Sequence, residues 1–167
     1  MNSVTAEMTG NGQFEARVQV GAHELIVDEP AERGGLGSGP NPYDLLCAAL
    51  AACTLMTLEL YAKRKGWTLD RLSVRVTHQK GSAEKRDRFD RTLELGTVTS
   101  EQRDALIKIA QRCPVDLLLE RGADVTVTIA EDGLGPARPD RLHALEVEEL
   151  CSEPDQGVVG AIRGHFR

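Results

Sequence analysis

The 167-residue sequence is poor in aromatic residues, and only 4% of its residues are Phe, Trp or Tyr. Leu, Val, Ile and Ala must therefore form most of the core, and the chain is long enough to fold as one ordinary domain. Positive charge is also scarce, because 20 Lys and Arg residues stand against 26 Asp and Glu residues, for a formal net charge of −6. A nucleic-acid-binding protein typically carries a basic stripe, so no nucleic-acid partner is expected.

The sequence lacks the paired cysteines of a metal site. Its four cysteines stand at positions 47, 53, 113 and 151, with no Cys-x-x-Cys and no nearby pair of histidines, so no structural metal is expected. A disulfide framework is not expected in a cytoplasmic protein of this size. Two interpretations of the thiols remain open: they are inert and buried, or two of them form a redox pair.

A membrane-spanning stretch is lacking as well. The longest uncharged run, residues 45–58, is shorter than the roughly 20 residues that span a bilayer, and Asp44 and Glu59 bound it. The N-terminal sequence MNSVTAEMTG has no basic segment leading into an apolar stretch, so it is not expected to be a secretory signal. We therefore expect no membrane partner and a cytoplasmic location.

The longest predicted element is a helix over residues 41–65. Asn41 is a good N-cap and Pro42 suits the first helical position, whereas Gly66 can adopt the left-handed conformation that ends helices. Between these ends the only polar residues of the uncharged run are threonines, so no face of the helix resembles a surface for water. A helix that is apolar all round is a buried helix, and Cys53 lies in its middle.

Several shorter segments alternate apolar and polar residues with the period of two that is typical of strands. They cover residues 13–20, 23–27, 72–79, 89–95 and 125–129. Gly21 and Ala22 predict a tight turn between the first two, and residues 1–12 are expected to be frayed. His23 is interpreted as a surface histidine on an edge strand and His78 as half-buried on the inner face of its strand.

The glycine-rich segment RGGLGSGPNP, residues 33–42, leads into the long helix. Free amides at a helix N-terminus bind anions readily, so a phosphate site has to be considered. The segment has neither the Lys-Ser/Thr of a P-loop nor the G-x-G-x-x-G spacing, and it has no G-x-S-x-G motif. We therefore predict a flexible connector and no cofactor.

A second helix is predicted from a capping box, Thr99 and Gln102, followed by an apolar stripe. The stripe consists of Leu106, Ile109, Ala110 and Cys113. Pro114 disfavours helical geometry at Cys113, so this thiol is expected at the C-terminal end of the helix. There the helix dipole disfavours a thiolate, which suits the resolving step of a redox reaction and leaves Cys53 as the attacking thiol. Cys47 lies about 120° around the helix from Cys53 and is interpreted as a packing residue.

From Glu131 onward the composition changes. DGLGPARPD has the composition of a linker, and LHALEVEEL is compatible with a short helix or an added edge strand. We expect residues 1–130 to form the domain and residues 131–167, which include Cys151, to be a C-terminal extension without an assigned role.

Two stretches together resemble one known family. GGLGSGPNPYDLLCAALAACTLMTLELYAKRKGW, followed about fifty residues later by EQRDALIKIAQRCPV, closely resembles the OsmC/Ohr family of cysteine peroxidases. The resemblance implies an α+β fold in which antiparallel sheets wrap two central helices in an intertwined homodimer. It also implies reduction of organic hydroperoxides by a peroxidatic cysteine, which matches Cys53, and a resolving cysteine, which matches Cys113. The resemblance further implies a dithiol as the reductant, which is a lipoyl dithiol in related enzymes.

The sequence departs from one branch of this family at a pair of positions. In the organic-hydroperoxide branch a glutamate follows the Asn-Pro and pairs with an arginine from the N-terminal strands to activate the thiolate. Tyr43 stands at the glutamate position here, and Arg17 is the nearest candidate for the arginine. The sequence therefore resembles the broader OsmC-like branch.

Three functional hypotheses follow from the sequence. The first is a cofactor-free, homodimeric thiol peroxidase in stress defence, with Cys53 attacking a hydroperoxide and Cys113 resolving the sulfenate. The second is a protein that binds a hydrophobic small molecule or senses redox state with the same two thiols, and the missing glutamate–arginine pair favours it. The third is a structural dimer in which both cysteines only pack.

Overall fold

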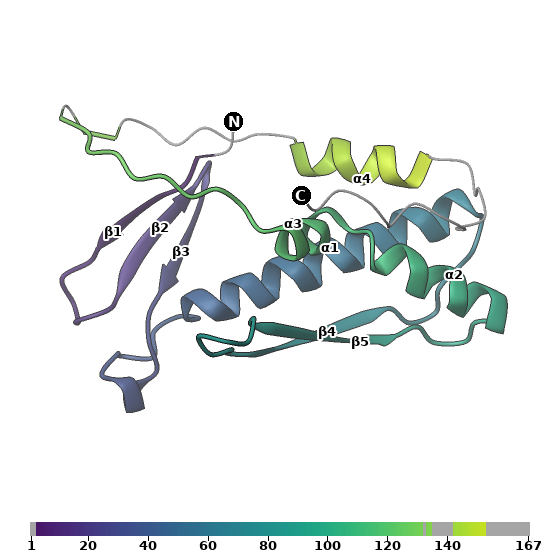
Figure 1. Ribbon diagram of the computed structural model, residues 1–167, viewed down its shortest axis with the longest axis horizontal. Coiled ribbons are helices and arrows are strands. Elements are labelled where there is room, and N and C mark those ends of the chain that lie inside the picture. Colours follow the sequence, from purple (N-terminus) through teal and green to yellow (C-terminus); the bar gives the residue numbers. More distant parts are fainter. Residues whose placement is uncertain (1–2, 132, 135–141, 153–167) are drawn as a thin grey trace.

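The computed structural model describes residues 3–131, 133–134 and 142–152. A long helix, α1 (Pro42–Arg64), runs through the centre of the molecule, and the other elements lie around it (Figure 1). α1 is long and apolar enough to cross a membrane by length and composition alone, a test that the core helix of a soluble protein also passes. It packs against β4, α2, α3 and α4, so it is such a core helix.

The predicted ends of α1 are confirmed. The Asn41 side chain accepts hydrogen bonds from the amides of Tyr43 and Asp44, and the Asp44 carboxylate accepts one from the Asn41 amide. This reciprocal capping box satisfies amides that the first helical turn leaves unpaired. Gly66 follows the C-cap with a φ of 69°, the left-handed conformation expected of it.

An antiparallel sheet of three strands, in the order β1-β2-β3, lies near the N-terminal end of α1 (Figure 1). Its strands are β1 (Thr5–Met8), β2 (Ala16–Val20) and β3 (His23–Val27). The predicted hairpin of β2 and β3 is confirmed, and His23 is exposed on the edge strand β3 as expected. The prediction that residues 1–12 are frayed is wrong for β1, because this strand pairs with β2 from Thr5↔Gln19 to Met8↔Ala16.

A second antiparallel hairpin, β4 (Ser73–Gln79) and β5 (Arg88–Glu94), lies along α1. His78 is half-buried in phase with the apolar residues of β4, as predicted. Its ring stacks on Tyr43 with centroids 4.6 Å apart and lies 4.7 Å from the ring of Phe89. His78 Nε2 also lies 2.8 Å from the Asp87 carboxylate. These contacts join the start of α1 to the hairpin.

The glycine-rich segment is held against the N-terminal sheet, in contrast to the flexible connector that was predicted. A short 3-10 helix, η1 (Ala31–Arg33), leads into it. The buried Asp28 carboxylate accepts hydrogen bonds from the amides of Leu36 and Ser38. A Cβ on Gly35 would collide with the Glu29 carbonyl, so glycine is required there for close approach of two backbone segments.

The C-terminal half forms three further helices, α2 (Ser100–Ala110), α3 (Pro114–Arg121) and α4 (Leu142–Ser152). The capping box at the start of α2 is confirmed, and its apolar stripe is buried. For residues 142–150 the sequence allowed a helix or a strand, and the structure has the helix. α4 packs on α1 and α3 and places Val147 and Cys151 in the main hydrophobic core.

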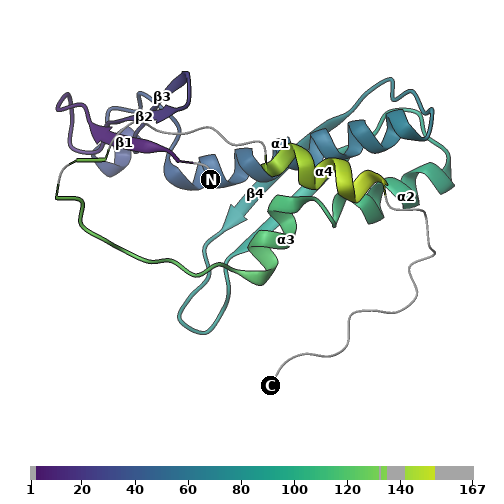
Figure 2. The same cartoon turned by 90° about the horizontal axis from the view of Figure 1, so that it is seen from above.

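The last predicted strand, residues 125–129, is not a strand within the described chain. Val125, Val127 and Ile129 are each more than 90% exposed. This segment leads from α3 toward the end of the molecule where β1 lies (Figure 2). α1 also has an exposed apolar face, because Leu46 is 44% and Met56 is 55% exposed. The expected burial of α1 on every side is therefore incomplete in a single chain.

Candidate active site

The structure brings Cys53 and Cys113 together. Cys53 lies in the middle of α1 and Cys113 is the N-cap residue of α3. Both are free thiols and almost fully buried, in a small cluster with Leu50. The two side chains are joined by a hydrogen bond, which residues distant in sequence form only because α3 packs on α1.

Besides the Cys53 thiol, three groups stabilise negative charge on Cys113. A guanidinium nitrogen of Arg91, Nη1, lies 4.0 Å from Cys113 Sγ, and the Thr54 hydroxyl lies 3.5 Å from the same sulfur. The backbone amide of Asp116, in the first turn of α3, donates to the thiol as well. The positive end of the α3 dipole points at the same sulfur.

Arg91 is fixed by its neighbours in this position. It comes from β5 and donates through Nη1 to the Ala110 carbonyl at 2.7 Å and to the Thr54 hydroxyl at 3.2 Å. Through Nη2 it forms an ion pair with the Asp116 carboxylate at 2.8 Å. The side chains of Arg91 and Asp116 are only 16% and 12% exposed, so this pair is screened little by water.

These contacts separate the acidities of the two thiols. The hydrogen bond from Cys53 lowers the pKa of Cys113 to about 6; Thr54, the Asp116 amide and Arg91 add to this effect, and burial opposes it. The same hydrogen bond, together with burial, raises the pKa of Cys53, although the Val115 amide donates to Cys53 Sγ at 3.4 Å. These contacts favour the proton on Cys53 and the negative charge on Cys113.

The electrostatic argument made from the sequence for Cys113 was wrong. We expected Cys113 at the C-terminal end of a helix, where the dipole disfavours a thiolate. α2 ends at Ala110, and Cys113 instead begins α3, with extended backbone at φ −62° and ψ 144°. Pro114 does divert the chain as predicted, but it starts a new helix, as proline at the first helical position commonly does.

Arg91 and Asp116 were missed by the sequence analysis. The alternation of β5 contained a signal for Arg91, because it is in phase with Phe89 and Leu93, which pack on the core clusters. A charged residue in the apolar phase of a strand points inward and needs a partner there. That partner, Asp116, lies in the first turn of α3, and no sequence pattern ties the two positions together.

The family positions that differ in this sequence lie away from the thiols. Tyr43 stacks on His78, and Arg17 pairs across the sheet with Glu24 at 3.4 Å. Cys47 is partly exposed and lines a second hollow with Tyr43 and His78. Cys151 lies 3.8 Å from the Thr57 carbonyl in the main core. Across the described residues, no three His, Cys, Asp or Glu side chains are grouped as metal ligands would be.

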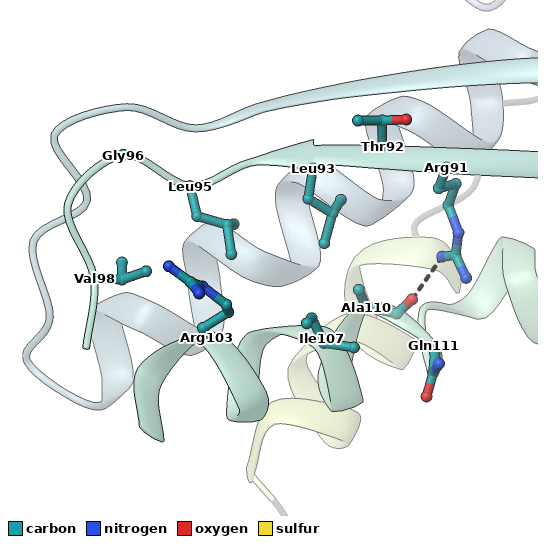
Figure 3. A pocket seen from close by; sticks show the side chains of 10 residues that line it. All are labelled: Arg91, Thr92, Leu93, Leu95, Gly96, Val98, Arg103, Ile107, Ala110 and Gln111. Atoms are coloured by element: carbon teal, nitrogen blue, oxygen red, sulfur yellow. Dashed lines mark hydrogen bonds between the residues drawn. The ribbon is translucent and has the colours of Figure 1, made fainter. Parts of the chain in front are cut away.

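A cavity of about 560 Å³ lies beside the thiol pair, between β5 and α2. Its apolar lining consists of Leu93, Leu95, Val98 and Ile107. Arg91 and Ala110 form one end of the cavity, and Arg103 lies toward the other end (Figure 3). Arg91 therefore both lines the cavity and contacts the Cys113 sulfur.

Comparison with known proteins settles the family. Residues 35–128, more than half of the chain, match the family described as OsmC-like protein. The chain belongs to the OsmC-like family. This confirms the resemblance to OsmC/Ohr proteins and the α+β fold class expected from the sequence. A comparison with curated protein sequences finds no match.

Solved structures of OsmC and Ohr proteins share the fold. An OsmC-like protein from Mycoplasma pneumoniae has a TM-score of 0.61 and 21% identity, over 72% of this chain and 87% of that one. An organic hydroperoxide resistance protein OsmC from Legionella pneumophila has a TM-score of 0.55 and 23% identity, over 71% and 88%. An organic hydroperoxide resistance protein from Elizabethkingia anophelis has a TM-score of 0.55 and 25% identity, over 70% and 86%.

Proposed function

We propose that this OsmC-like protein is a thiol peroxidase that reduces organic hydroperoxides. The observation that carries the proposal is the hydrogen-bonded pair of free thiols, Cys53 and Cys113, with Arg91 beside it. A thiolate is the nucleophilic form of cysteine, and a neighbouring cation and a helix N-terminus are the features that favour it. The similarity to organic hydroperoxide resistance proteins supports the choice of substrate.

The proposed reaction has two chemical steps. In the first step Cys53 Sγ attacks the terminal peroxide oxygen, so an S–O bond forms, the O–O bond breaks and Cys53 becomes a sulfenic acid. The Cys113 thiolate accepts the Cys53 proton as the attack proceeds and passes it to the departing alkoxide, which leaves as an alcohol. In the second step the Cys113 thiolate attacks the Cys53 sulfur, a disulfide forms and hydroxide leaves. The two thiols lose two electrons in total, and the peroxide gains them.

This assignment keeps Cys53 as the attacking sulfur and gives Cys113 two tasks. Cys113 accepts the hydrogen bond of Cys53, so it is the nearest base for the Cys53 proton. The contacts with Arg91 and the Asp116 amide keep it charged for the second step. An external dithiol, such as a lipoyl group, then reduces the disulfide by two thiol–disulfide exchanges. No metal or organic cofactor takes part in the scheme.

We propose further that the protein acts as a cytoplasmic homodimer. The alternating apolar side chains of residues 125–129 are more than 90% exposed in the single chain, which is costly for a segment with the pattern of a strand. A second copy can cover this segment by β-pairing and the exposed face of α1 by helix packing. An intertwined dimer would bury both of these apolar surfaces.

Steady-state kinetics test the proposal. With cumene hydroperoxide as substrate and a dithiol as reductant, we expect catalytic turnover by the wild type and by Cys47→Ser, whose thiol lies outside the pair. Cys53→Ser is expected to lose turnover. Undiminished turnover in Cys53→Ser would refute the assignment, and absence of turnover in the wild type would refute the proposed function.

A second candidate function is redox sensing or binding of a hydrophobic small molecule with the same thiols. The burial of both sulfurs favours it, because Cys53 is 2% and Cys113 0% exposed. A sensor would be oxidised once per molecule and would not turn over with excess dithiol. The same kinetic experiment therefore separates the two functions.

A further inference from the structure

Asp116 acts on the thiol pair in two opposed ways. Its backbone amide donates to the Cys113 sulfur, which favours the thiolate. Its carboxylate pairs with Arg91 at 2.8 Å, and Arg91 is the cation that lies 4.0 Å from the same sulfur. The carboxylate therefore neutralises charge that Arg91 would otherwise present to Cys113. The reaction proposed above uses Arg91 and the amide but gives this carboxylate no task.

The burial of these groups makes the neutralisation strong. The side chains of Arg91 and Asp116 are only 16% and 12% exposed, and the two sulfurs beside them are almost fully buried. Charges in such a place are screened little by water or salt. The guanidinium is also held in place, because it donates to the Ala110 carbonyl and to the Thr54 hydroxyl (Figure 3 shows the first of these bonds).

The charge of this buried group changes when the thiols are oxidised. In the reduced form the Cys113 thiolate, the Arg91 cation and the Asp116 carboxylate together carry a single negative charge. In the disulfide form the thiolate is gone, and the remaining ion pair is neutral. Without the Asp116 charge, the reduced form would be neutral and the disulfide form would hold an unpaired Arg91 cation. A nearly buried charge without a partner is costly, so the Asp116 carboxylate favours the disulfide over the thiolate.

We propose that Asp116 is a positioning residue that acts through Arg91 to keep the reduction potential of the Cys53–Cys113 pair low. Reduction of the disulfide takes two electrons from an external dithiol and breaks the S–S bond. Cys53 then takes up one proton, Cys113 leaves as the thiolate, and the second proton of the dithiol goes to solvent. The inference rests on the proposed peroxidase function for its biological role, because a low potential favours disulfide formation and calls for a strongly reducing dithiol.

Redox equilibration tests the inference without any peroxide. The full-length protein is equilibrated with dithiothreitol and its cyclic disulfide, and the reduced fraction is measured by thiol alkylation and mass spectrometry. Asp116→Asn keeps an oxygen for the hydrogen bond from Arg91 but loses the charge. We expect this variant to favour the reduced form about tenfold more than the wild type does, a rise of about 30 mV in the reduction potential.

Two further variants serve as controls. Asp116→Glu keeps the charge and should restore most of the wild-type equilibrium. Glu120→Gln removes an exposed carboxylate from the same helix, α3, and should leave the equilibrium unchanged.

A double variant separates this electrostatic role from a structural one. Arg91→Gln removes the cation and should shift the equilibrium in the opposite direction, toward the disulfide. The double variant Arg91→Gln/Asp116→Asn has the net charge of the wild type in both redox forms, so its potential should lie between those of the two single variants. A general loss of packing would not shift the single variants in opposite directions.

The titration of Cys113 provides the second readout. Asp116→Asn leaves the full charge of Arg91 to stabilise the thiolate, so the pKa of Cys113, about 6 in the wild type, should fall further. Arg91→Gln should raise this pKa. Thiolate absorbance against pH measures both changes.

The outcomes separate this inference from the proposed function. Wild-type equilibrium and titration in Asp116→Asn would overturn the inference, even if the protein turns over cumene hydroperoxide. Asp116→Ser, with a shorter neutral side chain, repeats the test if Asp116→Asn does not fold, and loss of folding in both would overturn the inference by assigning Asp116 to stability alone. The expected shifts in a protein that turns over no hydroperoxide would keep the role of Asp116 and overturn the peroxidase function.

Discussion

At the scale of single residues, the site depends on a proton that lies between two sulfurs and on an arginine that stabilises the thiolate. Cys53 donates to Cys113, and Arg91 with the first turn of α3 stabilises the resulting thiolate. Arg91 is in turn neutralised by Asp116. The two positions that the family resemblance singled out make other contacts: Tyr43 stacks on His78, and Arg17 pairs with Glu24.

The pH dependence of thiolate formation follows from these contacts. Because the pKa of Cys113 is lowered to about 6, the thiolate fraction should rise as the pH increases through that value and fall below it. Thiolate absorbance in the ultraviolet, recorded against pH, measures this titration. Cys113→Ser should remove the transition, and Cys151→Ser, in the main core, should keep it. A first thiol that titrates only near pH 8.5, the ordinary value, would contradict the proposed charge distribution.

The ion pair of Arg91 should contribute strongly to stability. Arg91→Gln leaves Asp116 nearly buried without a cation, so we expect a loss of about 3–5 kcal/mol in the free energy of unfolding. Arg88→Gln is a matched control in the same strand. Arg88 forms an exposed pair with Asp90, so its loss should change the free energy of unfolding far less than Arg91→Gln does. Urea unfolding measures both changes. Similar losses in the two variants would show that Arg91 is not held as the structure has it.

At the scale of elements, the sequence predicted most of the helices and strands around the site. The capping residues Asn41 and Thr99 marked the two helix starts correctly, because side-chain caps are local interactions. The role of Cys113 as an N-cap was not predicted. Proline is compatible both with the end of a preceding helix and with the first position of a new one, and Pro114 is the first residue of α3. Local sequence shows that proline diverts the chain, but it does not show in which direction the chain continues.

Alternation of apolar and polar residues predicted a strand correctly where a pairing strand lies within the described chain. It predicted one wrongly where no such pairing strand is present. β2, β3, β4 and β5 were predicted and are paired, whereas residues 125–129 have the same alternation and remain unpaired in the described chain. β1 was missed because its few residues, TAEM, alternate too briefly to be distinguished. The contact between Arg91 and the thiols could not be predicted either. It depends on how β5, α1 and α3 pack together, which no local pattern shows.

The extension after residue 130 has an element that belongs to the core. Val147 of α4 is 4% exposed, and its neighbour Leu145 is 61% exposed. Val147→Ala should therefore lower the free energy of unfolding by about 2 kcal/mol through lost burial and a small cavity. Leu145→Ala should change it by less than about 0.5 kcal/mol. Equal effects in chemical unfolding would mean that α4 does not dock on α1. We propose on this basis that α4, the described helix of the extension, belongs to the same domain as residues 1–130.

At the scale of the whole molecule, the exposed apolar surfaces call for a second copy. Sedimentation equilibrium should give twice the mass of the 18.2 kDa chain. Val127→Asp places a charge among the apolar side chains of residues 125–129 and should shift the equilibrium toward the monomer. Thr126→Asp adds the same charge to the opposite face of this extended segment and should disturb the dimer less. A monomeric wild type at micromolar concentration would contradict the dimer.

The central claim is that Cys53 and Cys113 act as one redox pair. The most direct measurement is non-reducing peptide mass spectrometry after treatment of the reduced protein with one equivalent of an organic hydroperoxide. We expect a Cys53–Cys113 disulfide, one alcohol formed per disulfide, and free thiols at Cys47 and Cys151. Recovery of all four thiols in reduced form, or a disulfide that involves Cys47 or Cys151 instead, would contradict it.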